Sequence, residues 1–250
     1  LHLSIRRQRQ MCIRDRYNDF IESNATNIQK GYHAMNKRET LAILEEIYKS
    51  NYTGSIIVQD YIHGGQGSEY SLNGYRAHDG KVSMVLARNL LSDMRPMWVG
   101  NHLVQVDYFD EEMFNTAEKI VSSLDYKGLF NFDFKKDSKT GKIYTLEMNI
   151  RQGRTFYYAT LGGVNLMKIA IDDMILGKSV SERTKRAFML TAIDKDICRE
   201  HLDSELLSEF DKKERLENTA IHIVNERDAA PERVERVRNA LKRQADDLYK

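Results

Sequence analysis

The sequence contains little cysteine, proline or tryptophan and has no long apolar run. Two cysteines, two prolines and one tryptophan occur among 250 residues. Cys12 and Cys198 stand far apart with no CxxC spacing, so neither a disulfide framework nor a structural zinc site is expected. No apolar run approaches the roughly 20 residues that a membrane-spanning helix needs, so we expect no membrane span.

An excess of charge of either sign is also lacking. The 38 lysines and arginines nearly balance the 37 aspartates and glutamates, which leaves a formal net charge of +1. Without a strongly basic field we expect no nucleic-acid partner, and any phosphate chemistry must depend on a local site. The 41% hydrophobic and 30% charged residues are typical of a packed globular protein, which we expect to be cytoplasmic.

Common catalytic signatures are missing as well. The sequence contains no GxSxG nucleophile elbow and no GxxxxGK phosphate loop. Its histidines show no metal-ligand spacing, and we interpret them as surface or structural residues.

The first 16 residues differ from the rest. Residues 1–16 are strongly basic and lack periodicity, and the run MCIRDR looks like translated sequencing-adapter sequence. The alternative is a disordered basic arm. In either case we exclude residues 1–16 from the fold, and we expect that a native N-terminal portion is missing upstream of Tyr17.

The periodicity of the remaining chain predicts helices mixed with antiparallel strands, an α+β protein. Asn36 and Glu39 have the spacing of a capping pair before a helix over 37–50, whose apolar stripe we expect at Leu41, Leu44, Ile47 and Tyr48. A buried strand is expected over 54–62, and Asp79-Gly80 predicts a hairpin between strands 69–77 and 81–91.

The middle of the chain continues this pattern. Asp110 is expected to cap a helix with an apolar stripe that runs from Met113 to Leu124. Residues 129–135 and 142–150 alternate as two strands of a hairpin, and 166–176 reads as a helix closed by Gly177.

Beyond residue 180 the chain becomes rich in charge. A short strand is expected within 218–226, and Pro231 is expected to begin a final helix. The predicted division sets 1–16 apart and then assigns three parts: a small subdomain with a hinge over 17–62, a large subdomain over 63–180, and a charged, mainly helical extension over 181–250.

Three oxygen-bearing side chains on the second hairpin form the sharpest local signal. Asp133 lies on the polar face of one strand, and Glu147 and Asn149 lie on the polar face of its partner. A short turn predicts that Asp133 is diagonal to Glu147, about 5–8 Å away. Two carboxylates and an amide suit Mg²⁺, or Mn²⁺ in its place. The alternative is a solvated strand face, which Asp and Asn disfavour because they are poor strand formers.

Two arginines follow this group. Arg151 and Arg154 could bind phosphate or carboxylate through their guanidinium forks, at the place where a transferred phosphoryl group needs charge stabilisation. The alternative is a pair of ordinary surface arginines.

These residues resemble a known family. Residues 147–151, Glu-Met-Asn-Ile-Arg, resemble the E-x-N-x-R element of ATP-grasp enzymes, and Asp133 stands where that family places its first metal carboxylate. Residues 56–65 are similar to the hinge between the two ATP-grasp subdomains. The resemblance implies the ATP-grasp fold, with antiparallel sheets, flanking helices and an N-terminal portion missing.

The resemblance also implies roles for single residues. By position, Gln59, Asp60, Tyr61 and Ile62 would line the adenine pocket, and Glu69 would approach the ribose. For Tyr61 and Ile62 the alternative is core packing. Lys30 looks like a phosphate-binding lysine of the family, and its alternative is an exposed lysine.

One branch of the family is more similar than the others. Arg88 and Arg95 look like the basic positions that face the triphosphate or the carboxylate in carboxylate–amine ligases, although both could be ordinary surface charges. Residues 155–166 also resemble this branch, whose members include D-aspartate ligases that act on cell-wall precursors.

The resemblance implies an ATP-dependent ligase. A carboxylate would attack ATP to form an acyl phosphate, and an amine would then displace phosphate, with an amino acid and a cell-wall precursor as the implied substrates. The alternatives are another ATP-grasp ligase such as a carbamoyl-phosphate-synthase-like enzyme, a non-catalytic ATP-binding module, or an interaction protein that uses residues 181–250. The oligomeric state is not readable from the sequence.

Overall fold

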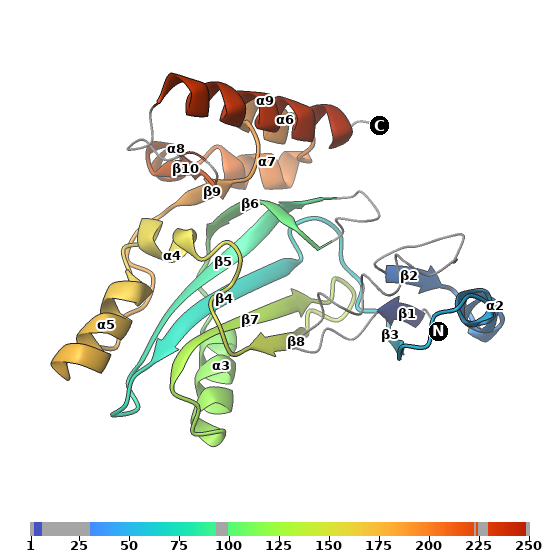
Figure 1. Cartoon of the computed structure of the whole chain (residues 1–250), viewed down its shortest axis with the longest axis horizontal. Helices are drawn as coiled ribbons and strands as arrows, with labels where there is room; N and C mark the ends of the chain where they lie inside the picture. The colour runs from blue at the N-terminus through green and yellow to red at the C-terminus, as the bar shows by residue number, and fades with distance from the viewer. Residues whose placement is uncertain (1–2, 7–30, 94–99, 223, 225–229, 249–250) are drawn as a thin grey trace. The chain divides into compact units, whose positions relative to one another are not determined.

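A computed structural model describes residues 3–6, 31–93, 100–222, 224 and 230–248 (Figure 1). Two of the predicted site residues, Lys30 and Arg95, lie outside the described residues. The chain divides into two compact units, one of Leu1–Ile62 with Met94–Asn101 and one of His63–Asp93 with His102–Lys250.

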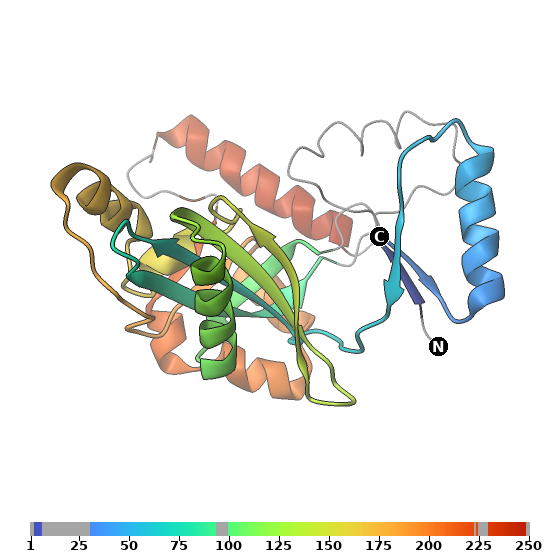
Figure 2. The same cartoon turned by 90° about the horizontal axis from the view of Figure 1, so that it is seen from below.

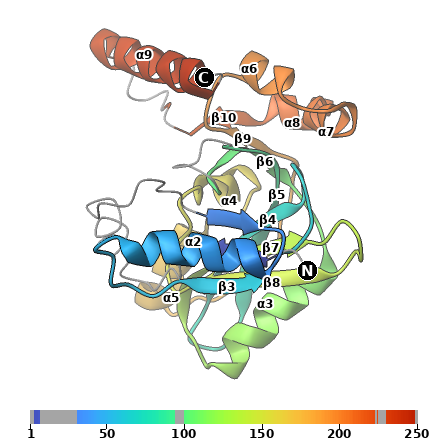
Figure 3. The ribbon, with the colours of Figure 1, turned by 90° about the vertical axis from the view of Figure 1, so that its right-hand side faces the viewer.

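Among its described residues, the first unit consists of a small antiparallel sheet and a helix packed against it. Its strand order is β2 (Gly31–Ala34), β1 (Leu3–Arg6) and β3 (Ile57–Asp60), and α2 (Lys37–Lys49) lies against β1 and β2 (Figure 3). The predicted cap of α2 is confirmed. Asn36 Oδ1 accepts from the Glu39 N–H at 3.0 Å, and the Glu39 carboxylate accepts from the Met35 N–H at 2.7 Å.

Three expectations for this unit are corrected. Ile47 is buried as expected, but Leu41 and Tyr48 are exposed, because α2 turns Thr40 inward beside Ile47. The strand expected over 54–62 is shorter, and Val58 on it is 40% exposed rather than buried. Residues 1–16 were excluded from the fold, but Leu3–Arg6 forms the central strand, where its backbone pairs with β2 and β3 on both sides.

The second unit is built on a seven-stranded sheet. The strand order is β10-β9-β6-β5-β4-β7-β8, and all neighbours are antiparallel except β9 and β10. Its strands are β4 (Glu69–Arg76), β5 (Val82–Ser92), β6 (His102–Asp107), β7 (Gly128–Lys136), β8 (Ile143–Asn149), β9 (Met189–Thr191) and β10 (Thr219–Ile221). The predicted β4–β5 hairpin is confirmed, and Gly80 supplies the positive φ of 91° that its turn requires.

Helices cover both faces of this sheet (Figures 1 and 2). On one face, α3 buries Met113, Phe114, Ala117 and Val121 against β4, β5 and β7. The other face meets α4 and α5. The helices of the unit are α3 (Glu111–Ser123), α4 (Tyr157–Leu161), α5 (Leu166–Leu176), α6 (Lys195–Glu200), α7 (Ser204–Phe210), α8 (Lys213–Glu217) and α9 (Pro231–Leu248).

The ends of these helices follow the sequence signals. Asp110 caps α3 by accepting from the Met113 N–H at 3.0 Å, and Gly177 ends α5 at a φ of 63°. Leu124, which was expected on the buried stripe, is 65% exposed because α3 has already ended at Ser123. None of the described helices is long and apolar enough to cross a membrane.

The charged, mainly helical extension expected over 181–250 contributes two strands to the main sheet. Residues 189–191 and 219–221 form strands of the main sheet, and the short helices between them pack on a third core cluster. Arg215, 5% exposed, ties this part to β6 through the Asp107 carboxylate at 2.7 Å. Backbone pairing and this buried ion pair therefore make residues up to 221 part of the second unit.

Candidate functional site

The β7–β8 hairpin brings the predicted metal residues together. Asp133 pairs directly with Glu147, and Asn131 pairs directly with Asn149. The diagonal placement predicted from the sequence is therefore wrong. A bulge between Asp133 and Phe134 makes Phe134 pair with Thr145, so Leu146 is an extra residue on β8 that shifts the register.

The neighbouring strand β4 extends this polar surface. Ser71 lies opposite Asp133, and Asn73 lies opposite Asn131. Directly paired residues project to the same face of a sheet, so the side chains form two adjacent polar rows across β4, β7 and β8. We call this set of side chains the polar face. Its members are Ser71, Asn73, Asn131, Asp133, Glu147 and Asn149.

Hydrogen bonds hold the polar face in order. The Ser71 hydroxyl donates to Asp133 Oδ1 at 3.2 Å. Asn149 Nδ2 donates to Glu147 Oε1 at 3.1 Å and to Asn131 Oδ1 at 3.2 Å. Both bonds of Asn149 use its amide nitrogen, so its amide oxygen takes part in neither. Ser71, Asn73 and Asn131 are buried, whereas Asp133, Glu147 and Asn149 are half-buried and reachable from solvent.

This donor set fits a hard divalent cation. Two carboxylates on paired strand positions and one amide oxygen are the ligand types that Mg²⁺ prefers, and the remaining positions of its shell are usually taken by water and substrate phosphates. Within the described residues no group of three or more His, Cys, Asp or Glu side chains comes together. A cation here would thus depend on oxygen ligands from the substrate as well as on Asp133, Glu147 and Asn149.

A third polar row lies beside these two. Glu69 on β4 pairs directly with Lys135 on β7 and with Asn89 on β5. Lys135 Nζ lies 3.4 Å from Glu69 Oε1, and Gln105 Nε2 donates to Asn89 Oδ1 at 2.8 Å. The structure therefore places Glu69 on the same face as Asp133, one pleat along the strands.

The loop that carries the two arginines is pinned to the polar face. The Gly153 N–H donates to Asn73 Oδ1 at 2.8 Å, and the buried Tyr158 hydroxyl after it donates to the Ser71 carbonyl at 2.8 Å. Burial holds the pKa of Tyr158 well above its usual range, so this hydroxyl keeps its proton. Gly153, which makes the contact with Asn73, lies between Arg151 and Arg154 in the chain, and both arginines are exposed.

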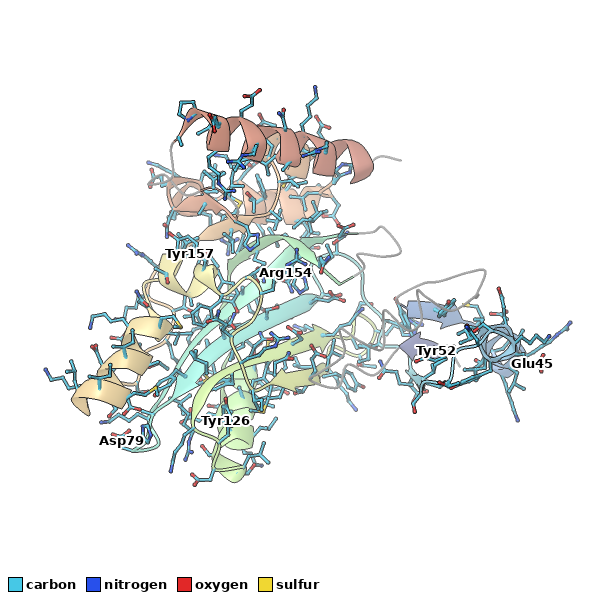
Figure 4. All side chains as sticks on the ribbon, viewed as in Figure 1. Glu45, Tyr52, Asp79, Tyr126, Arg154 and Tyr157 are labelled. Atoms are coloured by element: carbon cyan, nitrogen blue, oxygen red, sulfur yellow. The ribbon has the colours of Figure 1, made fainter. Side chains whose placement is uncertain are left out.

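The two arginines have different neighbours. Arg151 Nη1 donates to the Gln152 carbonyl at 2.9 Å. Arg154 lies in the loop between β8 and α4 (Figure 4). Burial is the main cause of the lowered pKa of the His222 imidazole, and the nearby positive charge of Arg154 is the second cause.

Arg88 is not brought to the polar face. It pairs with Tyr70 and Val106, so strand alternation sends its side chain to the opposite side of the sheet. There its Nε donates to the Gly67 carbonyl at 2.8 Å, and Nη2 lies 3.7 Å from Glu205 Oε1 of α7. Arg88 therefore lies on β5, as expected, with its side chain on the side of the sheet opposite to the polar face.

The predicted adenine residues belong to the first unit. Gln59 and Asp60 end β3 and are exposed, and Tyr61 and Ile62 follow the strand and are half-buried. The polar face lies in the second unit.

The site residues predicted from the sequence did not include three members of the polar face, Ser71, Asn73 and Asn131, or Lys135 in the row beside them. The signal was present, because polar residues alternate with apolar ones along both β4 and β7. Only the pairing register shows that the two alternating sets share a face.

Comparison with known proteins identifies the family. Residues 54–195 match the family described as "ATP-grasp in the biosynthetic pathway with Ter operon". The chain is also 30% identical over 205 residues to a D-aspartate ligase of Enterococcus faecium (strain Aus0004). That match covers 78% of this chain and 49% of the ligase, so the chain spans about half the length of this curated relative.

Two solved structures share the fold. The biotin carboxylase domain of Hydrogenobacter thermophilus 2-oxoglutarate carboxylase, solved with MgADP, ADP and bicarbonate, is 16% identical with a TM-score of 0.54. It matches 75% of this chain and 40% of its own. N5-carboxyaminoimidazole ribonucleotide synthetase from Thermus thermophilus is 15% identical with a TM-score of 0.51, over 75% of this chain and 45% of its own. At such identity these likenesses show the fold alone.

The expected α+β fold is thereby confirmed. The matched residues include the β7–β8 hairpin and the E-x-N-x-R element at 147–151. The chain belongs to the ATP-grasp superfamily.

Proposed function

We propose that this chain is the ATP- and Mg²⁺-binding part of a ligase that joins a carboxylate to an amine. The observation that carries the proposal is the direct pairing of Asp133 with Glu147 beside Asn149, on the half-buried polar face of an ATP-grasp sheet. The likeness to a D-aspartate ligase supports the choice of reaction within the superfamily.

Each group of residues would have its own role in binding Mg·ATP. Asp133, Glu147 and Asn149 would hold Mg²⁺, which when bound supplies positive charge to the phosphate oxygens. Glu69 would meet the ribose, and Gln59, Asp60, Tyr61 and Ile62 would line the adenine pocket. Arg151, Arg154 and Lys30 would stabilise charge on the transferred phosphoryl group. Arg88 is left out, because its side chain lies on the other face of the sheet.

The proposed reaction has two steps. A carboxylate oxygen of the acid attacks the γ-phosphorus of ATP, ADP leaves, and an acyl phosphate forms. The amine then attacks the acyl carbon, inorganic phosphate leaves, and the nitrogen loses a proton to give the amide. No side-chain nucleophile is needed, because positioning and charge stabilisation supply the catalysis.

The substrates follow from the relative rather than from the site. An amino acid as the carboxylate substrate fits the name of the D-aspartate ligase. A cell-wall precursor as the amine is what the resemblance of residues 155–166 implies. Dependence on ATP agrees with a cytoplasmic location. We assign 17–62 to the small subdomain and hinge and 63–180 to the large subdomain, which puts the proposed metal group in the large one.

Two measurements on the chain test this proposal. Mg·ATP should raise the melting temperature, since saturation at about 100 times the dissociation constant adds about 2.7 kcal/mol of stability. ADP release should then require both an acid and an amine, which a screen of amino acids against amines would reveal.

The outcomes separate the alternatives. Binding of Mg·ATP without amine-dependent ADP release would favour a non-catalytic module. ADP release that depends on bicarbonate and ammonia would favour carbamoyl-phosphate-type chemistry. No effect of Mg·ATP on melting would contradict the proposal and leave an interaction role for residues 181–250.

A further inference from the structure

We infer that Lys135 is a positioning residue that holds Glu69 for the ribose of the bound nucleotide and so makes the site prefer ATP to its deoxyribose analogues. This inference rests on the proposed function, because it assumes that the polar face binds ATP. It concerns a residue that the sequence analysis did not single out.

The first observation is the pairing itself. Lys135 and Glu69 occupy directly opposed positions on β7 and β4, and Lys135 Nζ lies 3.4 Å from Glu69 Oε1. The Lys135 side chain is 7% exposed and that of Glu69 is 23% exposed. Lysine is almost never buried this deeply without a charged partner, because the ammonium loses its hydration. The contact with the Glu69 carboxylate therefore offsets part of the hydration that the buried Lys135 ammonium group loses.

The second observation is the chain packed above Lys135. A Cβ added at Gly64 would lie 3.3 Å from Lys135 Cε and 2.4 Å from the Ser68 hydroxyl oxygen. The Lys136 N–H donates to the Ser68 carbonyl at 2.9 Å, which fixes the entry of the chain into β4. Gly64 thus lies close to the Lys135 side chain and limits the room that this side chain has to change rotamer.

A Lys135 side chain that is held in one rotamer also holds the Glu69 carboxylate in place. The contact uses one oxygen of Glu69, and the other, on a side chain that is still partly exposed, can accept a hydrogen bond from a sugar hydroxyl. Hydrogen bonds from a hydroxyl to an ionised carboxylate are among the stronger ones in proteins. Without Lys135 the carboxylate would be free to rotate, and ordering it again would cost part of the energy of that bond.

The test compares three nucleotides on matched variants of the chain. Dissociation constants for Mg·ATP, Mg·2′-deoxyATP and Mg·3′-deoxyATP are measured by calorimetry. The wild-type chain should bind ATP about tenfold more tightly than at least one deoxy analogue, the ratio expected for one charge-assisted hydrogen bond. Lys135→Met should remove most of this preference, mainly by weakening ATP, while the affinity for the deoxy analogue stays within about twofold of wild type.

Two further variants keep the outcome clear. Glu69→Gln should remove the same preference, and the double variant should lose no more than either single variant, because both act on one contact. Lys136→Met, on the other face of the same strand, should leave the preference unchanged. If Lys135→Met is too unstable to measure, an unaltered preference in Glu69→Gln overturns the inference.

Failure of the inference differs from failure of the proposed function. An equal loss for all three nucleotides in Lys135→Met overturns the inference alone. Equal affinity of the wild-type chain for all three overturns the inference and the ribose role of Glu69, and leaves the proposed ligase reaction untouched. No binding of Mg·ATP by the wild-type chain contradicts the proposed function, and the inference with it.

Discussion

The two faces of strand β7 differ in what they bury and in what they can do. Phe130, Phe132 and Phe134 project towards α3 and are fully buried. Asn131 and Asp133 alternate with them and project to the polar face. One face binds the strand to a close-packed core, and that core holds the polar side chains of the other face at fixed positions without covering them all.

Residues that stabilise the fold and residues that could take part in chemistry therefore alternate along a single strand. Apolar burial dominates the free energy of folding, whereas the polar face contributes ordered oxygen atoms. Substitutions on the α3 side should therefore change unfolding, and substitutions on the polar face should change catalysis. Substitutions on the two faces and at their edges test this separation.

The largest effect is expected on the apolar side. Phe132→Ala should lower the free energy of unfolding by about 3–5 kcal/mol, because Phe132 is fully buried and packs between two other rings. Denaturant titration measures this value. Phe109→Ala serves as the control, since Phe109 is 59% exposed, and a loss of the same size there would break the comparison.

The next effect is expected in catalysis. Glu147→Gln should reduce amine-dependent ADP release at least about 100-fold, because the substitution removes a proposed metal ligand while it keeps the shape of the side chain. The melting temperature should change little, since Glu147 is only half-buried. Glu112→Gln, on the exposed side of α3, is the matched control. ADP release close to wild type in Glu147→Gln would remove the metal role.

A smaller effect is expected where the arginine loop meets the sheet. A Cβ at position 153 would lie 2.8 Å from Asn73 Oδ1 and 3.1 Å from Asn131 Nδ2. Gly153→Ala should therefore shift Arg151 and Arg154 away from the polar face and lower ADP release roughly tenfold. Gly65→Ala introduces a Cβ with no heavy atom within 4 Å and should keep wild-type ADP release. If both variants behave alike, the close approach at Gly153 has no functional role.

The smallest effect concerns the turn between β7 and β8. Hydrogen bonds hold the pKa of the Asp137 carboxyl below its ordinary value of 3.8, with the Thr140 N–H as the largest cause and the His63 N–H also contributing. Because the pKa is lower in the folded state, this stabilisation is present above the ordinary value and is lost as pH falls through the folded-state pKa. Asp137→Asn should lower the melting temperature at pH 7, and the difference from wild type should shrink at pH 3. A difference independent of pH would assign the loss to packing.

Much of the fold could be predicted from local signals. The caps at Asn36 and Asp110, the glycine at the end of α5 and the β4–β5 turn all depend on neighbours in the chain, and the structure confirms them. The candidate metal residues could also be predicted, because alternation places Asp133 opposite to the phenylalanines. Features that depend on distant partners were missed. Strand pairing decides three such features: the bulge at Leu146, the face of the sheet on which Arg88 lies, and the use of residues 189–191 as a strand.

By itself the sequence determined which residues are polar, which alternate and where helices begin and end, because these properties follow from bonds within a few residues of each other. The tertiary structure alone decided that Ser71, Asp133 and Glu147 stand in one row and that Lys135 meets Glu69. The reason is the period of a strand: a shift of one residue in pairing exchanges the two faces, and only long-range packing sets that register.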